Sequence, residues 1–288
     1  MRVVVTGGDG FAGRWLCRLL ADDGAHVVAW VRRKPAAPLP GVQYRVQDIR
    51  DAPGCSQGMR EDAPDQVFHL AAITHLGQAE EDPKAAHVTN VDGTHNVMAA
   101  TPRGATAVFA STCHVYGPPS SLPIDESHPC APGGTYAQTK LLAEEAATES
   151  CSRAVIARAF HHTGPGQSTQ YALSDWAQKV AAGQVVWTGD LSLRRDYSDV
   201  RDICAGYRLL AEAGTPHEIY NLCSGAAPAL ETLLMGMGDC VQATVDPSRL
   251  RSGDIREFRG DPSKAEALGW RRSISTQQML ADLVQSFR

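Results

Sequence analysis

The chain has 288 residues, of which 43% are hydrophobic, and a formal net charge of −5 at pH 7. This length and composition allow a sizeable hydrophobic core and exclude disorder over most of the chain. The net negative charge argues against a nucleic acid or an anionic membrane surface as partner. The eight cysteines never form a C-x-x-C pair, so we expect reduced thiols rather than a disulfide framework or a zinc site.

The N-terminus opens directly into an apolar run and shows no charged segment followed by an apolar stretch, so we expect no signal peptide. No apolar stretch approaches the roughly 20 residues needed to span a bilayer. We therefore expect a globular protein of the cytoplasm.

Short apolar runs alternate with amphipathic stretches in the first half of the chain. The runs predict buried strands at residues 3–5, 27–31, 67–70, 108–110 and 155–157. The stretches between them predict helices at residues 12–21, 87–100 and 136–151. This alternation predicts an α/β fold with a doubly wound parallel sheet of the Rossmann type.

The pattern changes after the G-P-G sequence at 164–166. The second half predicts a helix at 171–182, a strand at 185–188, an extended segment at 195–200, a helix near 201–213, a strand at 219–222 and a helical remainder at 229–288. We expect a cofactor-binding domain of residues 1–165, completed by about 192–223. A smaller C-terminal substrate-binding lobe would contain residues 166–191 and 224–288.

A glycine-rich turn lies between the first predicted strand and the first predicted helix. Glycine allows a tight turn and a close approach of the backbone to a pyrophosphate, while the helix N-terminus offers free N–H donors. We predict that the residues of this turn bind a dinucleotide cofactor, namely Gly7, Gly10, Phe11 and Gly13.

The second predicted strand ends in Arg32 and Arg33, where dinucleotide-binding domains often carry an acid that binds the adenosine ribose. Two arginines at this position suit a 2′-phosphate, which favours NADP as cofactor and leaves NAD possible. The alternative is a solvated basic loop.

Further cofactor contacts are predicted after the next two strands. Asp48 and Ile49 follow the third strand and are expected beside the adenine. Leu70, Ala71 and Ala72 end the fourth strand, and the small side chains among them would let the cofactor approach.

Tyr136 and Lys140 form a Y-x-x-x-K pair at the start of a predicted helix. At this spacing the two side chains share a helix face, and a nearby ammonium should lower the pKa of the phenol toward neutral pH. Tyr136 would then act as acid and base, and Lys140 could also hold the cofactor ribose. Thr112 ends a strand, so its hydroxyl could bind the reacting oxygen. The alternative is a chance pair on the surface of a helix that takes no part in catalysis.

Five motifs occur in order along nearly the whole chain: G-x-x-G-x-x-G, S-T-x-x-V-Y-G, Y-x-x-x-K, an arginine followed by G-P-G, and R-D-Y-S-D-V. Together they resemble the extended short-chain dehydrogenase/reductase enzymes of the NAD-dependent epimerase/dehydratase family. The chain is most similar to the branch of GDP-mannose 4,6-dehydratase and GDP-4-keto-6-deoxymannose reductase. The resemblance implies a nucleotide-diphosphate sugar bound between the two lobes, and a homodimer. Thr112, Tyr136 and Lys140 match the catalytic triad of that family.

The resemblance also implies substrate contacts. Asn90 matches the family's asparagine on the helix beside the active site. Arg195 and Arg251 match arginines that contact the substrate pyrophosphate, a pairing that charge complementarity favours. Each arginine could instead belong to a surface salt bridge.

Two residues of the expected substrate site depart from the family pattern, and a third, Cys113, has an open role. His114 stands where sugar 4,6-dehydratases carry a glutamate base, so standard dehydration is disfavoured. His161 stands where many relatives carry asparagine next to the substrate phosphates. Cys113 could act as an acid, contact the sugar or simply fill space. A metal site at His161 and His162 is not expected, because adjacent side chains diverge and the sequence offers no third ligand nearby.

We therefore expect an enzyme that transfers hydride at C4 of a nucleotide sugar through a 4-keto intermediate. A nucleotide-sugar 4-epimerase is favoured, because the dehydratase base is missing. The alternatives are a nucleotide 4-keto-sugar reductase, an atypical dehydratase that uses His114 or Cys113, and a catalytically silent NADP-binding regulator.

Overall fold

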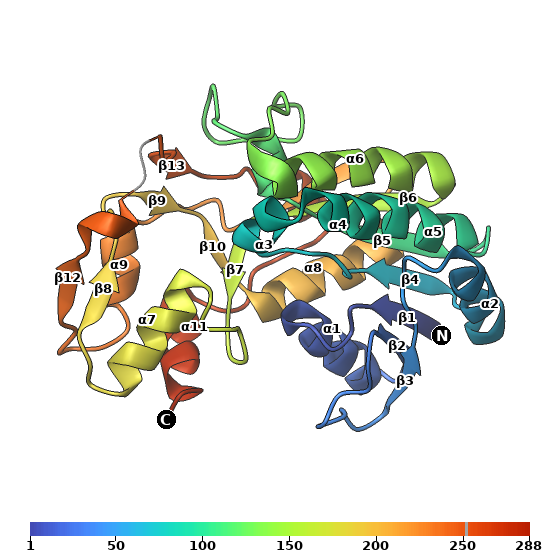
Figure 1. Cartoon of the computed structure of the whole chain (residues 1–288), viewed down its shortest axis with the longest axis horizontal. Coiled ribbons are helices and arrows are strands. Elements are labelled where there is room, and N and C mark those ends of the chain that lie inside the picture. The colour runs from blue at the N-terminus through green and yellow to red at the C-terminus, as the bar shows by residue number, and fades with distance from the viewer. Residues whose placement is uncertain (251–252) are drawn as a thin grey trace.

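The computed structural model describes residues 1–250 and 253–288 of the chain. At its centre lies a seven-stranded sheet with the order β11-β6-β5-β4-β1-β2-β3 (Figure 1). Its strands, in chain order, are β1 (Arg2–Thr6), β2 (His26–Val31), β3 (Val42–Val46), β4 (Gln66–His69), β5 (Thr106–Thr112), β6 (Ala154–Ala159) and β11 (Ile219–Leu222). All neighbours run parallel, which confirms the predicted Rossmann-type sheet.

The strand order reverses between β1 and β4. From β1 the chain adds β2 and β3 on one side, then crosses back to add β4, β5, β6 and β11 on the other. At such a switch point the loops after the strands diverge and leave a crevice for a ligand. The glycine-rich turn follows β1, so the topology places it at this crevice.

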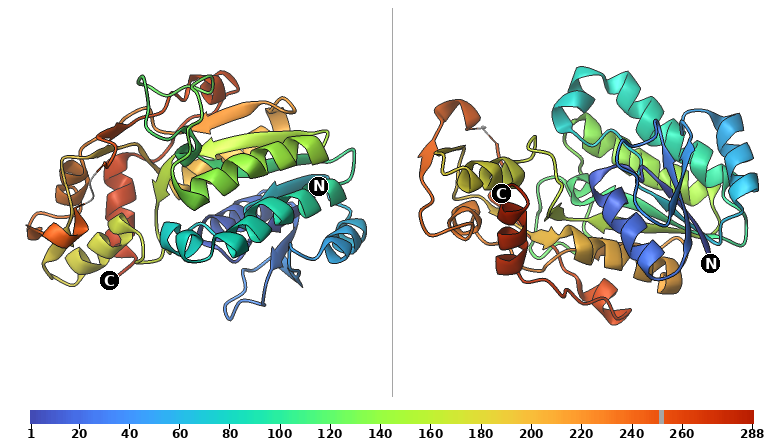
Figure 2. Two further views of the ribbon diagram at one scale, coloured as in Figure 1. Left: turned by 45° about the horizontal axis from the view of Figure 1, so that its top comes forward. Right: turned by 90° about the horizontal axis from the view of Figure 1, so that it is seen from below.

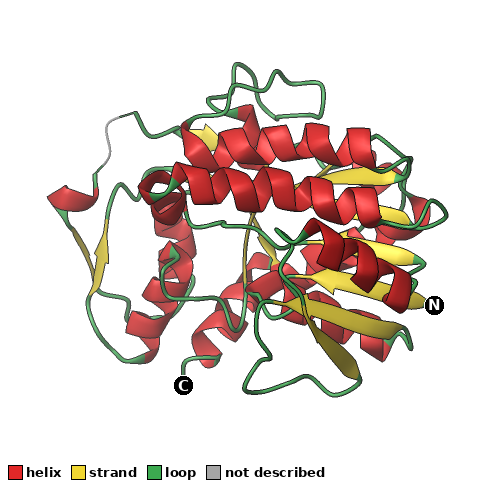
Figure 3. Ribbon diagram, turned by 45° about the vertical axis from the view of Figure 1, so that its right-hand side comes forward, coloured by secondary structure: helices red, strands yellow, loops and turns green. Residues whose placement is uncertain are grey.

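Helices cover both faces of the sheet (Figure 3). One face packs against α1 (Phe11–Asp22) and α8 (Val200–Ala213), and the other against α2 (Ala52–Asp62), α5 (Gly93–Ala100) and α6 (Gly134–Ser150). Side chains alternate along β1, so Val3 and Val5 pack on the face covered by α1 and α8, and Val4 packs on the face covered by α2, α5 and α6. Because both faces are buried, the inner strands read as continuous apolar runs.

A smaller lobe lies beside the carboxyl ends of the strands (Figure 2). It contains α7 (Ala172–Ala181), α9 (Leu230–Met235) and α11 (Thr276–Gln285), together with a ladder of β8 (Val186–Thr188) and β12 (Ala243–Val245). Its own core includes Trp176, Leu233 and Leu283.

Short parallel ladders connect this lobe to the sheet. The strand β7 (His161–Thr163) follows β6 and pairs with β10 (Tyr197–Asp199). The strand β9 (Arg194–Arg195) pairs with β13 (Glu257–Phe258). Residues from distant parts of the chain therefore meet directly above the end of the sheet.

Two sequence expectations need correction. The predicted helix at 87–100 consists of α4 (Pro83–His87), a π-helical turn η1 (Val88–Asp92) and α5, preceded by α3 (Leu76–Glu81). The remainder at 229–288 is only partly helical: beside α9 and α11 it contains β12, the 3-10 turn η3 (Pro247–Arg249), β13 and α10 (Ser263–Ala267). Local periodicity misses β12 and β13, because each forms only by pairing with a strand far away in sequence. In the described part of the chain, no helix combines the length and apolarity needed to cross a membrane.

A buried carboxylate on α8 fastens the segment that leads into α11. Asp202 is 2% exposed and accepts hydrogen bonds from the N–H of Ser273 at 2.9 Å, the hydroxyl of Ser273 at 2.8 Å and the N–H of Ile274 at 3.1 Å. This aspartate therefore joins the helix that covers the sheet to the C-terminal part of the smaller lobe.

Replacing Asp202 with alanine should lower the free energy of unfolding by about 3 kcal/mol, because it leaves buried N–H groups without an acceptor. Urea unfolding followed by circular dichroism measures this loss. Asp190→Ala is the matched control, since Asp190 accepts the same kind of hydrogen bonds from Ser192 at an exposed turn. Equal stabilities of the two variants would contradict the assignment.

Candidate active site

The turn between β1 and α1 is shaped for a close ligand. Gly7 has φ +67°, and a Cβ added there would lie 2.9 Å from the backbone of Ala71. A Cβ on Gly13 would lie 2.1 Å from the carbonyl oxygen of Gly7. Gly10 caps α1 without a side-chain hydrogen bond from the described residues. The first N–H groups of α1 therefore remain available to an anion, which fits the pyrophosphate of a dinucleotide.

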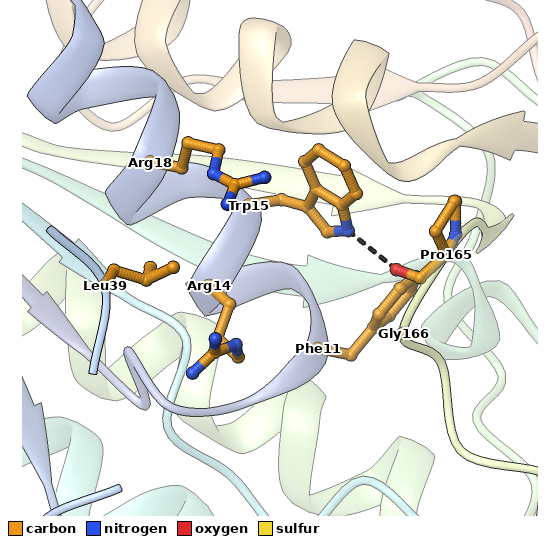
Figure 4. A pocket seen from close by; sticks show the side chains of 7 residues that line it. All are labelled: Phe11, Arg14, Trp15, Arg18, Leu39, Pro165 and Gly166. Atoms are coloured by element: carbon orange, nitrogen blue, oxygen red, sulfur yellow. Dashed lines mark hydrogen bonds between the residues drawn. The ribbon is translucent and has the colours of Figure 1, made fainter. Parts of the chain in front are cut away.

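One hydrogen bond fastens α1 to the loop after β7. The indole N–H of Trp15 donates to the carbonyl oxygen of Pro165 at 2.9 Å (Figure 4). A pocket of about 150 Å³ surrounds this bond, and its lining residues are Phe11, Arg14, Trp15, Arg18, Leu39, Pro165 and Gly166. The predicted catalytic residues do not line this pocket. The Trp15–Pro165 hydrogen bond holds the start of α1, and the glycine-rich turn before it, against the loop after β7.

The predicted adenosine contacts lie at the ends of β2 and β3. Arg32 and Arg33 follow β2 and are exposed. The guanidinium of Arg50 lowers the pKa of Asp48 by a two-pronged ion pair, and the charge of Arg32 adds to this effect. Arg32 therefore lies near Asp48. The side chain of Ile49 is buried in the core between the sheet and the helices α2, α5 and α6.

Leu70, Ala71 and Ala72 follow β4 directly beside the turn. The N–H of Ala71 donates to the hydroxyl of Thr6 at 3.2 Å, which ties the end of β4 to the end of β1. The structure thus brings the predicted cofactor residues of β1 and β4 together at the switch point.

Tyr136 and Lys140 lie on one face of α6, and both are buried. The ammonium of Lys140 donates to the carbonyl oxygen of Ala110 on β5 at 2.6 Å and lies 4.0 Å from the ring centroid of Phe109. Thr112 ends the same strand and is buried. The three predicted catalytic side chains therefore meet where α6 passes the carboxyl end of β5.

One expectation about these residues is wrong for the chain by itself. Burial raises the pKa of Tyr136 above its ordinary value, and a hydrogen bond with Thr112 opposes this rise only in part. Lys140 is not among the groups that shift the pKa of the phenol. Burial in turn lowers the pKa of Lys140 to about 7, although the charge of Glu144 opposes the shift.

Asn90 lies in the π-helical turn η1 and is 1% exposed. Its amide accepts from the N–H of Ile73 at 2.8 Å and donates to the Ile73 carbonyl at 3.1 Å and to the Thr139 hydroxyl at 3.0 Å. Asn90 therefore holds the loop after β4 against α6, next to Lys140. In this structure it supports the site and does not face the expected substrate with a free amide.

Two imidazole rings and a thiol form the wall beyond Tyr136. The ring of His114 stands edge-on to the rings of Tyr136 and His161, with centroids 6.1 and 5.3 Å apart. Cys113 is buried, and its sulfur lies within 4.8 Å of ligand atoms of both histidines. His162 points elsewhere, since its ring stacks on Phe11 at 6.2 Å. The adjacent histidines thus diverge, as the sequence indicated.

Arg195 lies close to this wall. Its guanidinium donates to the carbonyl oxygens of Arg194 at 2.9 Å and Ile255 at 2.7 Å. Its positive charge, after the larger effect of burial, lowers the pKa of His114. A cation held by two carbonyls can meet an anionic ligand without reorientation. Arg251 lies outside the described residues.

A buried ion pair supports α6 from behind. Glu144 receives two hydrogen bonds from the guanidinium of Arg158 on β6, at 2.9 and 2.7 Å, and one from the hydroxyl of Ser111 on β5. Both charged side chains are almost fully buried. The pair joins α6, β5 and β6 at the level of Lys140.

Sequence reasoning missed two aromatic side chains of the site. The ring of Tyr197 lies 5.3 Å from that of His161, and the ring of Phe258 lies 6.4 Å from that of His114. The R-D-Y-S-D-V motif contains Tyr197 and could have indicated it. Phe258 belongs to β13 and carries no local signal.

Comparison with known proteins agrees with this geometry. The model of the NAD dependent epimerase/dehydratase family matches residues 3–223. The chain is 31% identical over 307 residues to a GDP-6-deoxy-D-mannose reductase of Pseudomonas aeruginosa, covering 99% of this chain and 97% of that protein. It is 34% identical over 303 residues to a UDP-glucose 4-epimerase of Rhizobium meliloti, covering 93% and 91%.

A solved structure shows the same fold. RMD from Pseudomonas aeruginosa, complexed with NADPH, superposes with a TM-score of 0.84 at 26% identity, covering 100% of this chain and 99% of that one. The motifs, the parallel sheet and the family match agree over most of the chain. The protein therefore belongs to the NAD-dependent epimerase/dehydratase family.

Proposed function

We propose that the protein is an NADP-dependent enzyme that acts at C4 of a nucleotide-diphosphate sugar, and that its net reaction is 4-epimerisation. The observation that carries this proposal is the meeting of Thr112, Tyr136 and Lys140 at the end of β5, beside a glycine turn that fits a pyrophosphate. The names of the reductase and epimerase relatives support a nucleotide sugar as substrate.

The side chains divide the proton chemistry between them. Tyr136 takes the proton of the C4 hydroxyl, while Thr112 binds the same oxygen and holds it in line. Lys140 lies one turn after Tyr136 on α6 and could bind the ribose of the cofactor. A bound nicotinamide would supply the acceptor and donor of the C4 hydride, and its positive charge when oxidised would favour the phenolate of Tyr136. This charge would offset the burial that raises the pKa of Tyr136.

Substrate binding is proposed on the side of the site where Arg195 lies. Arg195 would pair with the diphosphate, because its guanidinium is already held by two carbonyls. The smaller lobe would bind the nucleotide, and the domain division expected from the sequence stays a prediction. A homodimer and a cytoplasmic location also stay predictions of the sequence.

The balance between epimerase and reductase depends on the fate of the hydride. An epimerase returns it to the other face of C4, so no cofactor is consumed. A 4-keto-sugar reductase consumes NADPH, and the reductase relative that covers 99% of this chain favours it as the second candidate. Dehydration is disfavoured, because His114 stands in place of a carboxylate. A silent regulator is disfavoured, because Tyr136 and Lys140 are both present.

The test follows deuterium placed at C4 of UDP-glucose and GDP-mannose. We expect the purified protein to retain oxidised cofactor and to form the 4-epimer of one of these sugars with deuterium kept at C4, as NMR would show. Tyr136→Phe should lower this turnover by about 10²–10⁴-fold and leave cofactor binding intact. Stoichiometric loss of NADPH with a 4-keto sugar would instead establish the reductase, and loss of water by mass spectrometry would establish a dehydratase.

The preference for NADP is proposed from Arg32 and Arg33. Changing both to alanine should weaken NADP binding about 10- to 100-fold, because each charge-assisted hydrogen bond to the 2′-phosphate is lost. NAD binding should change little, and calorimetry with both cofactors measures the ratio. An equal loss of affinity for the two would show that these arginines form a general basic loop.

The buried amine of Lys140 predicts a pH-dependent stability. Its pKa is about 7 in the folded chain, against an ordinary value of 10.5. Between these values the unfolded chain binds more protons, so the folded state gains stability as pH rises. From pH 7 to pH 10, the wild type should gain on the order of 1–3 kcal/mol relative to Lys140→Met in urea unfolding. Lys84→Met changes an exposed lysine and should keep the wild-type slope.

A further inference from the structure

Three side chains with metal-binding atoms converge on the wall beyond Tyr136. Cys113, His114 and His161 each offer one ligand atom, and all three atoms lie within 4.8 Å of one another. Cys113 and His114 follow β5, whereas His161 follows β6. Because these strands are neighbours in the sheet, their carboxyl ends bring together residues that are distant in sequence. The sequence near His161 offers no such set of ligands, and the fold supplies Cys113 and His114 from the neighbouring strand end.

His161 also has an unexplained polar atom. Its Nδ1 is buried and has no hydrogen-bond partner among the described residues. Buried polar atoms are almost always paired with protein, water or a ligand, and a bound ion would pair this one.

We propose that Cys113, His114 and His161 form a binding site for one divalent cation of intermediate softness, with Zn²⁺ as the best match. A thiolate and two imidazoles are ligands that Zn²⁺ prefers, and three protein ligands leave one position open. The site adjoins the proposed catalytic residues, since the ring of His114 lies 6.1 Å from that of Tyr136. The open position would take water or an oxygen of a substrate.

Binding of a metal ion requires the three ligand atoms to move closer together than they lie in this structure. Around a tetrahedral zinc ion, ligand atoms lie about 3.5 Å apart, so the side chains must move inward by roughly 1 Å. We assign this movement to the rings of His114 and His161, which are partly buried, whereas Cys113 is buried. The sulfur of Cys113 lies at the start of a short 3-10 turn.

The charges around the site also bear on binding. Burial raises the pKa of Cys113, the carboxylate of Asp196 adds to this effect and the guanidinium of Arg195 opposes it. On binding, the S–H bond of Cys113 breaks, a metal–sulfur bond forms and the proton leaves to the buffer, with no change of oxidation state. The raised pKa opposes loss of the proton, and the bound cation would offset this by stabilising the thiolate.

The experiment uses Co²⁺ as a spectroscopic probe on the full, untagged chain after chelator treatment. We expect one Co²⁺ per chain, a near-ultraviolet thiolate-to-cobalt band and visible bands of four-coordinate cobalt. Zn²⁺ should abolish these bands by displacement, and calorimetry in buffers of different ionisation enthalpy should show release of about one proton per ion.

Variants locate the site. Cys113→Ser should remove the thiolate band, and His161→Asn should weaken binding about tenfold or more. Cys130→Ser and His95→Asn change exposed residues elsewhere and should keep the wild-type spectrum. Binding of NADPH reports that each variant is folded, and His161→Asn tests the site even if Cys113→Ser does not fold. The proposal is overturned if the wild type shows no thiolate band, or if the band survives in both site variants.

Discussion

The buried ion pair between Glu144 and Arg158 is the interaction on which the site depends. It fixes α6 against β5 and β6, and Ser111 donates to the same carboxylate. Removing one partner of such a pair costs about 3–5 kcal/mol, because the other charge stays buried and unpaired. With α6 held in this way, Tyr136 and Lys140 face the end of β5. The placement of the proposed catalytic residues thus depends on a contact between α6 and β6.

The parallel sheet then distributes the parts of the site. All strands present their carboxyl ends to one edge, and the order reverses between β1 and β4. The glycine turn after β1 therefore lies beside the loop after β4, whereas the polar residues after β5 and β6 lie farther along the same edge. The turn proposed for the pyrophosphate, the proposed catalytic residues and the two imidazoles thus follow one another along one edge of the sheet. The smaller lobe lies beside this edge.

Burial sets the ionisation of the central residues more strongly than their pairing does. It raises the pKa of Tyr136 and lowers that of Lys140 to about 7. The i, i+4 spacing suggested that the ammonium would favour the phenolate, yet Lys140 is not among the groups that shift the pKa of Tyr136. The chain by itself therefore holds a neutral phenol. A positive charge brought by a cofactor would be felt strongly there, since the low-dielectric surroundings screen it little.

The sequence by itself determined the parallel sheet, the glycine turn, and the shared face of Tyr136 and Lys140, because these follow from local periodicity and from spacing along one helix. The smaller lobe was read only in part, since β12 and β13 exist through pairing with distant strands. Only the tertiary structure decided what surrounds each site residue. It joined Cys113 to His161 and placed Phe258 beside His114. Such contacts depend on neighbouring strand ends, and no pattern within a short stretch of sequence records which ends will be neighbours.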